Sequence, residues 1–223
     1  MLVAAGRGER LGADRPKAFA RLGDDVLLAE PLRRLDESEW IDRIVIVAPP
    51  GWEEPAILCA EENSCSKVWT CVTGGETRVE SVRAGVAEVP EDAVAILVHD
   101  AARPLVTDDV IGRVLAPLSE GWDGVVPGLP VADTLKRVEG DRVVETVSRD
   151  GLVAVQTPQA FPAATLRAAV LDPSNKLLQG ATDCAALVEQ AGGRVKVVAG
   201  DPRLVKVTDR SDLGLVASWL APS

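Results

Sequence analysis

The opening segment of the chain combines glycines with positive charges at a spacing suited to phosphate. Met1–Ala4 has the apolar character of a strand that is ending, and it runs directly into the small residues and glycines of Ala5–Gly12. A glycine-lined loop lets an anion approach a row of backbone N–H groups closely. Because Arg10 and Lys17 add cations beside that backbone, the segment predicts a phosphate-binding loop.

The interval between the glycines distinguishes this loop from two common nucleotide loops. A Walker A loop needs G-x-x-x-x-G-K-[ST], and neither the separation of Gly6 from Gly12 nor the residue after Gly12 matches it. A dinucleotide fingerprint needs G-x-G-x-x-G, whereas this chain reads G-x-G-x-x-x-G. The predicted strand Ile44–Val47 also runs into alanine and prolines, not into an acidic residue that could hold a ribose. A nicotinamide-dependent oxidoreductase is therefore disfavoured.

The loop resembles the signature loop of sugar-phosphate nucleotidyltransferases, with A-A-G-x-G-x-R-x-G followed by Pro16 and Lys17. Further motifs along the chain resemble one family within that group, the 2-C-methyl-D-erythritol 4-phosphate cytidylyltransferases. These motifs occur in the family's order and span nearly the whole chain: Gly74–Val82, Val98–Pro104, Asp133–Lys136, Arg149–Leu152, Thr157–Gln159 and Val205–Thr208.

The resemblance implies transfer of a cytidylyl group from CTP to a polyol phosphate, with Mg²⁺ as the cofactor and Asp100 as the metal-binding carboxylate. The family's catalytic positions correspond to Arg10, Lys17, Arg149 and Lys206. Its contacts to the nucleotide correspond to Ala4, Ala5, Gly6, Gly8, Gly74, Gly75, Glu76, Ser81 and Ala101. Its contacts to the polyol phosphate correspond to Asp100, Arg103, Thr134, Thr157 and Thr182.

The implied reaction needs charge stabilisation more than proton transfer. A phosphomonoester has a second pKa near ~6, so the attacking group is already largely deprotonated at neutral pH. The chain's single histidine, His99, is expected to be a packed structural residue, not an acid or base. Phosphoryl-type transfer depends on positioning and on cations that offset the charge of the transition state. Lysines, arginines and a metal ion suit that task.

Some of these residues also have plain structural interpretations. Asp100 follows a predicted strand and could simply cap the next segment. Arg78 could bridge helices, and it is left out of the catalytic set. Two other functions also remain open: a ribitol-5-phosphate cytidylyltransferase, and a non-catalytic nucleotide-binding protein on the same fold. The retention of Arg10, Lys17 and Lys206 favours an enzyme, because binding alone would not need all three.

Apolar runs alternate with segments of helical spacing along the chain, which predicts an α/β fold with a Rossmann-like, mostly parallel sheet and helices on both faces. We expect one nucleotidyltransferase domain over residues 1–223. The predicted strands are Arg43–Ala48, Lys67–Val72, Ala93–Val98, Gly124–Val126, Leu152–Val155 and Arg194–Val198. The predicted helices are Leu28–Leu35, Glu53–Glu61, Thr77–Ala87, Asp108–Leu118, Ala163–Leu171, Asp183–Gln190 and Asp212–Leu220.

One stretch interrupts the alternation. Asp133–Val138 and Arg142–Val147 read as two strands joined by a short glycine turn. An isolated two-stranded hairpin is marginal in water, so it should pack against something. The resemblance implies that residues 133–150 form a protruding β-hairpin dimerisation arm. Such an arm would hook around the other subunit of a homodimer and bring Thr134 and Arg149 to the partner's active site.

Composition narrows the partners and the compartment. A net charge of −10 and an aromatic content of 3% argue against nucleic-acid binding. No apolar run approaches the ~20 residues of a membrane span, and the opening segment does not resemble a signal peptide. The spacing of Cys59, Cys65, Cys71 and Cys184 does not fit a zinc site, so free thiols are expected. These features predict a cytoplasmic enzyme.

Overall fold

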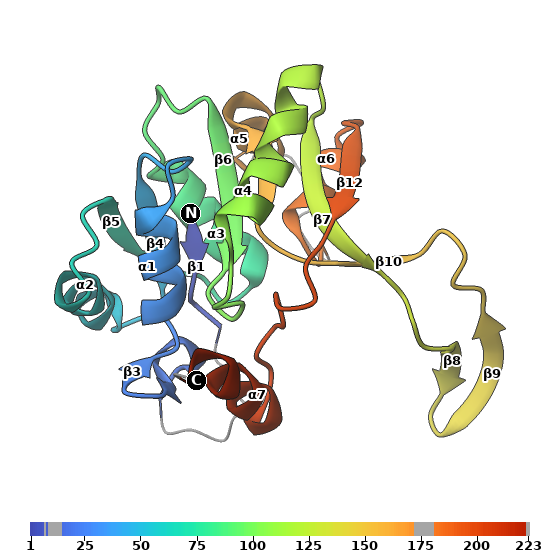
Figure 1. Cartoon of the computed structure of the whole chain (residues 1–223). Helices are drawn as coiled ribbons and strands as arrows, with labels where there is room; N and C mark the ends of the chain where they lie inside the picture. The colour runs from blue at the N-terminus through green and yellow to red at the C-terminus, as the bar shows by residue number, and fades with distance from the viewer. Residues whose placement is uncertain (7, 9–14, 172–180, 222–223) are drawn as a thin grey trace.

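A central eight-stranded sheet organises the body of the protein (Figure 1). The fold was obtained as a computed structural model, which describes residues 1–6, 8, 15–171 and 181–221. The strands run in the order β10-β7-β11-β6-β1-β4-β5, and β12 also pairs with β7. Their bounds are Leu2–Val3 (β1), Ile44–Ala48 (β4), Val68–Thr73 (β5), Ala95–Asp100 (β6), Gly124–Pro130 (β7), Val153–Val155 (β10), Gln159–Pro162 (β11) and Val195–Ala199 (β12).

Most strand pairs of the sheet are parallel, as the sequence predicts. Strand β1 is parallel to both β4 and β6, β4 is parallel to β5, and β12 is parallel to β7. The exceptions are β10 and β11, which run antiparallel to their neighbours. Strand β11 has no counterpart among the predicted strands. It is only four residues long, is buried over most of its length, follows Pro158 and ends at Pro162, so it carries no alternating pattern.

Helices cover both faces of the sheet, and the alternation of side chains along each strand explains why. Ile44, Ile46 and Leu97 point into one apolar cluster, whereas the neighbouring residues Ile96 and Val98 point into another. The first cluster includes α1 (Ala29–Glu37), α2 (Glu53–Glu62) and α4 (Asp108–Leu115). The second includes α3 (Arg78–Ala87), α5 (Ala163–Leu171) and α6 (Cys184–Gln190).

Five further elements of the described residues complete the body. The predicted helix at 108–118 divides into α4 and the 3-10 helix η3, because Pro117 has no N–H with which to continue the α-helical ladder. These remaining elements are η2 (Lys17–Phe19), β2 (Arg21–Leu22), β3 (Asp25–Val26), η3 (Ala116–Glu120) and α7 (Arg210–Leu220). In the part of the chain that the structure describes, no helix has the length and apolar character needed to cross a membrane.

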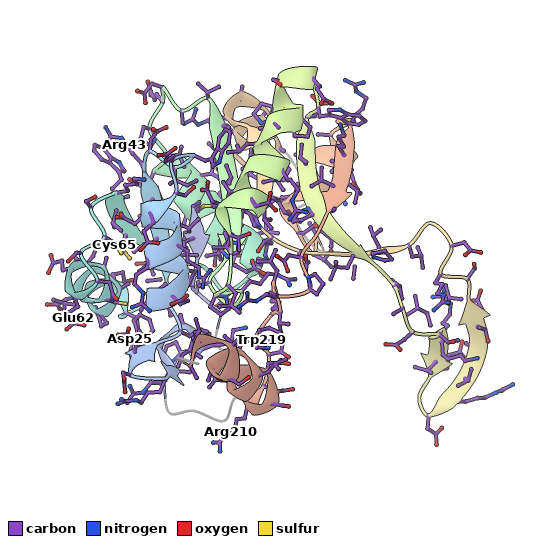
Figure 2. All side chains as sticks on the ribbon, in the orientation of Figure 1. Asp25, Arg43, Glu62, Cys65, Arg210 and Trp219 are labelled. Carbon is purple, nitrogen blue, oxygen red and sulfur yellow. The ribbon has the colours of Figure 1, made fainter. Side chains whose placement is uncertain are left out.

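The predicted hairpin is present and stands away from the body as a separate two-stranded sheet (Figure 1). Strands β8 (Leu135–Glu139) and β9 (Arg142–Val147) are antiparallel and are joined at Gly140, whose φ is 62°. Figure 2 shows the side chains of this arm standing apart from those of the body. Val138 and Val143 are 56% and 53% exposed. The arm therefore presents apolar surface that its own chain leaves uncovered.

The strand order also locates the crevice where ligands bind in open α/β sheets. Strand β1 lies between β4 and β6, and the order of strands reverses there. Ligands bind beyond the carboxyl ends of the strands at such a switch point. The carboxyl end of β1 leads into the glycine loop, and that of β6 is Asp100. The fold thus brings the chain's two most suggestive motifs to one edge.

Candidate active site

A cavity of about 450 Å³ opens at this edge of the sheet. It is lined by the ends of β1, β5 and β6 and by the segment that precedes α7. The predicted site residues that line it are Ala4, Ala5, Gly6, Lys17, Gly74, Gly75, Glu76, Ser81, Asp100, Ala101 and Lys206. Segments far apart in the sequence therefore meet around one space.

The glycine loop is shaped by its contact with Lys17. A Cβ on Gly6 would have no atom of the described residues within 4 Å, so these residues leave the backbone of Gly6 open to a ligand. A Cβ on Gly8 would lie 2.4 Å from the Cβ of Lys17, and Gly8 has a φ of +66°. Gly8 therefore allows the loop to pass close to Lys17, whose Nζ donates to the carbonyl of Val207 at 3.1 Å. Arg10 lies outside the described residues.

The segment that follows β5 forms another wall. A Cβ on Gly74 would lie 2.4 Å from the Cβ of Ala5, so the end of β5 and the glycine loop touch directly. The N–H of Gly75 donates to the Oγ of Ser81 at 3.1 Å, and that hydroxyl lies 3.0 Å from the carbonyl of Thr77. Ser81 is thereby a fixed part of the wall, whereas Glu76 is exposed at the rim.

Helix α3 begins at this wall, and its start is well defined. Thr77 and Glu80 form a capping box, in which each side chain accepts from the backbone N–H of the other residue. The first residue of the helix is Arg78, which also lines the cavity. Because the cap fixes the backbone at this point, it also fixes the position from which the Arg78 side chain extends.

The carboxylate of Asp100 is the charged floor of the cavity and has two cationic partners. Lys206 Nζ lies 2.7 Å from Oδ2, and Arg78 Nη2 lies 3.2 Å from Oδ1. Burial by itself would raise the pKa of Asp100, but the charges of Arg78 and Lys206 outweigh it and hold that pKa well below its usual range. Asp100 is therefore a carboxylate at any pH near neutrality, and the interpretation as a simple helix cap does not describe it.

Arg78 is the functional candidate that the sequence analysis set aside. Its position inside the motif Gly74–Val82 was the available signal. The sequence also suggested that it bridges helices, and its Nη1 does lie 3.5 Å from the Sγ of Cys184 at the start of α6. The contact with Asp100 adds a role toward the cavity that the motif alone could not indicate.

Thr157 lies beneath the cavity, and its hydroxyl already has two partners. The backbone N–H of Asp100 donates to Thr157 Oγ1 at 3.0 Å, and that hydroxyl lies 3.1 Å from His99 Nδ1. The hydroxyl proton is therefore directed at Nδ1, so that Nε2 of His99 carries the ring proton and donates to the carbonyl of Arg103 at 2.9 Å. Here Thr157 supports the segment 100–103 from below instead of lining the cavity.

His99 is a packed structural histidine, as predicted. It is fully buried, and this burial lowers its pKa to about 4 even though its hydrogen bond to Arg103 favours the charged form. The imidazole is neutral near pH 7 and serves as a rigid link between Thr157 and Arg103. It therefore braces both ends of the segment that carries Asp100.

Arg103 points toward the segment that carries Lys206. Its Nη1 donates to the carbonyl of Leu204 at 2.6 Å, and its Nη2 lies 3.4 Å from the carbonyl of Val155. The N–H of Val207 also donates to the carbonyl of Ala102, at 2.7 Å. Arg103 and Ala102 thus hold the backbone on either side of Lys206. Arg103 is not among the described residues that line the cavity.

The remaining predicted contacts to the polyol phosphate lie apart from the cavity. Thr134 and Arg149 are exposed residues in the two links between the body and the arm, and Arg149 donates to the carbonyl of Ala132. Thr182 is exposed just before Asp183, the N-cap of α6. Within one chain, the described residues that are predicted to contact the nucleotide lie together. The predicted site residues of the arm, Thr134 and Arg149, do not line the same cavity.

A magnesium site fits the floor of the cavity. Among the described residues, no cluster of three or more histidine, cysteine, aspartate or glutamate side chains could hold a metal ion by itself. Mg²⁺ is usually bound through one or two carboxylates together with substrate phosphates. The buried, ionised carboxylate of Asp100 suits such a shared site, in which the nucleotide supplies most of the oxygen ligands.

Comparisons with known proteins match this chain over nearly its whole length. The enzyme named 2-C-methyl-D-erythritol 4-phosphate cytidylyltransferase from Rubrobacter xylanophilus is 40% identical over 222 residues, covering 99% of this chain and 94% of the relative. The enzyme of the same name from Nocardia farcinica is 43% identical over 221 residues, covering 99% and 92%.

Solved structures agree with the sequence relatives. The crystal structure of the enzyme of that name from Thermus thermophilus superposes with a TM-score of 0.79 at 32% identity, covering 98% of this chain and 96% of that one. The structure from Francisella tularensis gives a TM-score of 0.83 at 26% identity, with 99% and 98% covered. The sequence profile of the 2-C-methyl-D-erythritol 4-phosphate cytidylyltransferases matches residues 1–221, and this chain belongs to that family.

Proposed function

We propose that this protein transfers the cytidylyl group of CTP to 2-C-methyl-D-erythritol 4-phosphate. The products are 4-diphosphocytidyl-2-C-methyl-D-erythritol, an intermediate of isoprenoid biosynthesis, and pyrophosphate. The observation that carries the proposal is the cavity itself, where Lys17, Lys206 and Asp100 meet the glycine loop in a chain that matches the family from end to end.

The proposed chemistry is an attack by the phosphate of the polyol on the α-phosphate of CTP. The two reactants repel each other, so the main task of the enzyme is to offset charge in a fixed geometry. Lys17 and Lys206 line the cavity from opposite ends of the sequence, and we assign them to the phosphates. Arg10 is assigned to the triphosphate by the family pattern alone. Backbone N–H groups of Ala5, Gly6 and Gly8 are assigned to the phosphates as neutral donors.

Mg²⁺, when bound, would neutralise part of the triphosphate charge and orient it. Asp100 is the residue that we assign to hold it. The rest of the nucleotide is assigned to the wall that follows β5. There Gly74, Gly75 and Ser81 present backbone groups and a buried hydroxyl, with Glu76 at the rim. The close contact of Gly74 with Ala5 supports this assignment, because it places this wall directly beside the glycine loop to which the phosphates are assigned.

The polyol half of the site is proposed to form in a homodimer. The exposed valines of the arm and the distance between the arm and the body support this proposal (Figure 1). In the dimer, Thr134 and Arg149 of one subunit would serve the cavity of the other. Arg103, Thr157 and Thr182 would serve the polyol phosphate within the same chain, with Arg103 and Thr157 acting from beneath the cavity floor.

The chain is proposed to form one domain, with residues 133–150 as the arm, and to work in the cytoplasm. The four cysteines of the described residues are free thiols, which suits a reducing compartment.

Pyrophosphate release from CTP tests the function directly. With Mg²⁺, we expect turnover with 2-C-methyl-D-erythritol 4-phosphate to exceed turnover with ribitol 5-phosphate, and CTP to exceed other triphosphates. Faster turnover with ribitol 5-phosphate would overturn the polyol assignment while preserving the reaction class. Nucleotide binding without any pyrophosphate release would leave only the non-catalytic alternative.

A further inference from the structure

The two cations on Asp100 contact different oxygens of its carboxylate. Lys206 Nζ contacts Oδ2 at 2.7 Å, whereas Arg78 contacts Oδ1 through Nη2 at 3.2 Å and through Nε at 3.4 Å. The Asp100 side chain is only 10% exposed. Either cation can therefore move away without breaking the contacts of the other, and the carboxylate would keep a partner.

The two cations differ in how firmly they are held. The Arg78 side chain extends from the capped first turn of α3, and its Nη1 also contacts the fully buried Cys184 at the start of α6. Its side chain is 23% exposed. Lys206 belongs to a segment without helix or strand, its side chain is 42% exposed, and it lines the cavity. Arg78 is thus the fixed partner and Lys206 the movable one.

Electrostatics also favours a lasting pair of Arg78 with Asp100. The guanidinium lies at the N-termini of α3 and α6, where the helix dipoles disfavour a cation. Asp100 offsets that effect, so the arginine and the carboxylate stabilise each other. Lys206 lies at no helix N-terminus, and a phosphate in the cavity would compete directly for its ammonium group.

We infer that Arg78 is a positioning residue that acts as the permanent counter-ion of Asp100, so that Lys206 can leave this carboxylate and pair with the phosphates of the nucleotide. The inference rests on the proposed function, since it assumes that the cavity takes a nucleoside triphosphate. Without Arg78, the release of Lys206 would leave a buried carboxylate unpaired, which is strongly unfavourable. With Arg78 present, the release exchanges one ion pair for another. Oδ2 then becomes free for a cation that accompanies the nucleotide.

Titration of CTP into the protein in EDTA tests this exchange without any contribution from a metal. We expect Arg78→Gln to weaken CTP binding about tenfold or more, because Asp100 would then depend on Lys206 for its counter-charge. Adding Asp100→Asn to that variant should restore most of the affinity, because the asparagine carries no charge to retain Lys206. Arg83→Gln is the matched control, since Arg83 is exposed on the same helix, and it should bind CTP like the wild type.

Thermal melting without ligand provides an independent measurement. Arg78→Gln and Lys206→Gln should each lower the Tm modestly. The Tm of the double variant should fall by more than the sum of the two single shifts, and the excess should be about 10 °C or more. Asp100→Asn in the double variant should recover most of that loss. Additive shifts, or no recovery with asparagine, would overturn the inference.

The two measurements separate the possible failures. If the wild-type protein binds CTP neither in EDTA nor with Mg²⁺, the proposed function is wrong, and the melting data still report on the ion pairs. If the wild type binds CTP and Arg78→Gln binds it equally well, Arg78 only bridges helices and the inference is wrong. Arg78→Lys should bind CTP with intermediate affinity, because it keeps the charge but not the forked contact.

Discussion

The floor of the cavity and the arm carry residues of one predicted site, yet they obtain their positions in opposite ways. On the floor, Asp100 is fixed by Thr157 from below and by Arg78 from the side. On the arm, Thr134 and Arg149 lie in exposed links, and the hairpin beyond them is a sheet of its own. Residues of the floor are positioned within the chain, whereas in the proposed homodimer the residues of the arm are positioned against a second subunit. The proposed site is therefore complete only after assembly.

The largest effect should come from removing a cation that lines the cavity. Lys17→Ala is expected to lower turnover by ~10²–10³, because a preorganised donor to the transition state is lost. Its effect on stability should be about 1 kcal/mol, the usual cost of losing a hydrogen bond such as the one to Val207. Steady-state kinetics and urea unfolding measure the two effects. Near-normal turnover would remove Lys17 from the catalytic set.

Acid should weaken the floor of the cavity through His99. The pKa of His99 is about 4 in the folded protein and about 6.5 in an unfolded chain. Above pH 6.5 both states are neutral at this residue, and its contribution to stability is complete. Between pH 6.5 and 4, His99 becomes protonated in the unfolded chain but stays neutral in the folded protein. The free energy of unfolding should therefore fall by about 3 kcal/mol across this window from His99 alone.

His99→Gln isolates this contribution from those of other titrating groups. Glutamine keeps a donor toward the carbonyl of Arg103 but does not titrate. Urea unfolding at a series of pH values should give the variant a flatter profile than the wild type between pH 6.5 and 4. Parallel profiles would mean that His99 takes up its proton at the same pH in the folded protein as in the unfolded chain, which would contradict its role as a buried neutral link between Thr157 and Arg103.

The sequence predicts the nucleotide side of the site more completely than the polyol side, and the reason is physical. The glycine loop and Gly74 follow strands and Asp100 ends one, and strands of a parallel sheet bring their carboxyl ends to one edge by topology. Thr157 precedes β11, a short buried strand that has no periodic signal, so its place beneath Asp100 could not be foreseen. The family resemblance implied a substrate contact at Thr157, and the structure adds that its buried hydroxyl supports the backbone of Asp100.

The arm illustrates a different limit. Its strands are predicted from alternation and the Gly140 turn, and β9 has the predicted bounds. The sequence pattern of a hairpin reflects only its own two strands and its turn. It therefore contains no information about where the hairpin lies relative to the body of the protein. In the proposed homodimer, the positions of Thr134 and Arg149 relative to a cavity depend on the partner subunit, which no pattern within a single chain describes.

Mixing two inactive variants tests whether the arm serves a neighbouring cavity. If Arg149 acts on the partner's site and Lys17 on its own, a heterodimer of Arg149→Ala and Lys17→Ala has one doubly defective site and one intact site. Random equal exchange makes about half of the dimers mixed, so pyrophosphate release should recover to about a quarter of the wild-type rate.

The control for this experiment is a mixture of Lys17→Ala with Lys206→Ala. Both lysines line the same cavity of one chain, so mixing them produces no intact site and no recovery. Subunit exchange is verified by mass spectrometry of differently labelled chains. If exchange occurs and the first mixture stays inactive, Arg149 does not act across an interface.

The smallest effect compares two glycines, one in each region. Gly8 and Gly140 have nearly the same φ, +66° and +62°, but only Gly8 is crowded, with Lys17 atoms at 2.4 and 3.2 Å from an added Cβ. Replacement by alanine strains both backbones alike, by about 1 kcal/mol. Gly8→Ala must also displace Lys17, so we expect its turnover to fall about tenfold. Gly140→Ala should stay within about twofold of the wild-type turnover, because a Cβ there meets open space at the tip of the arm.

Kinetics and melting curves of both variants separate backbone strain from the displacement of Lys17. An equal loss of turnover at similar Tm would show that the tip of the arm is as tightly enclosed in the working enzyme as the glycine loop, which would place the partner subunit directly over Gly140.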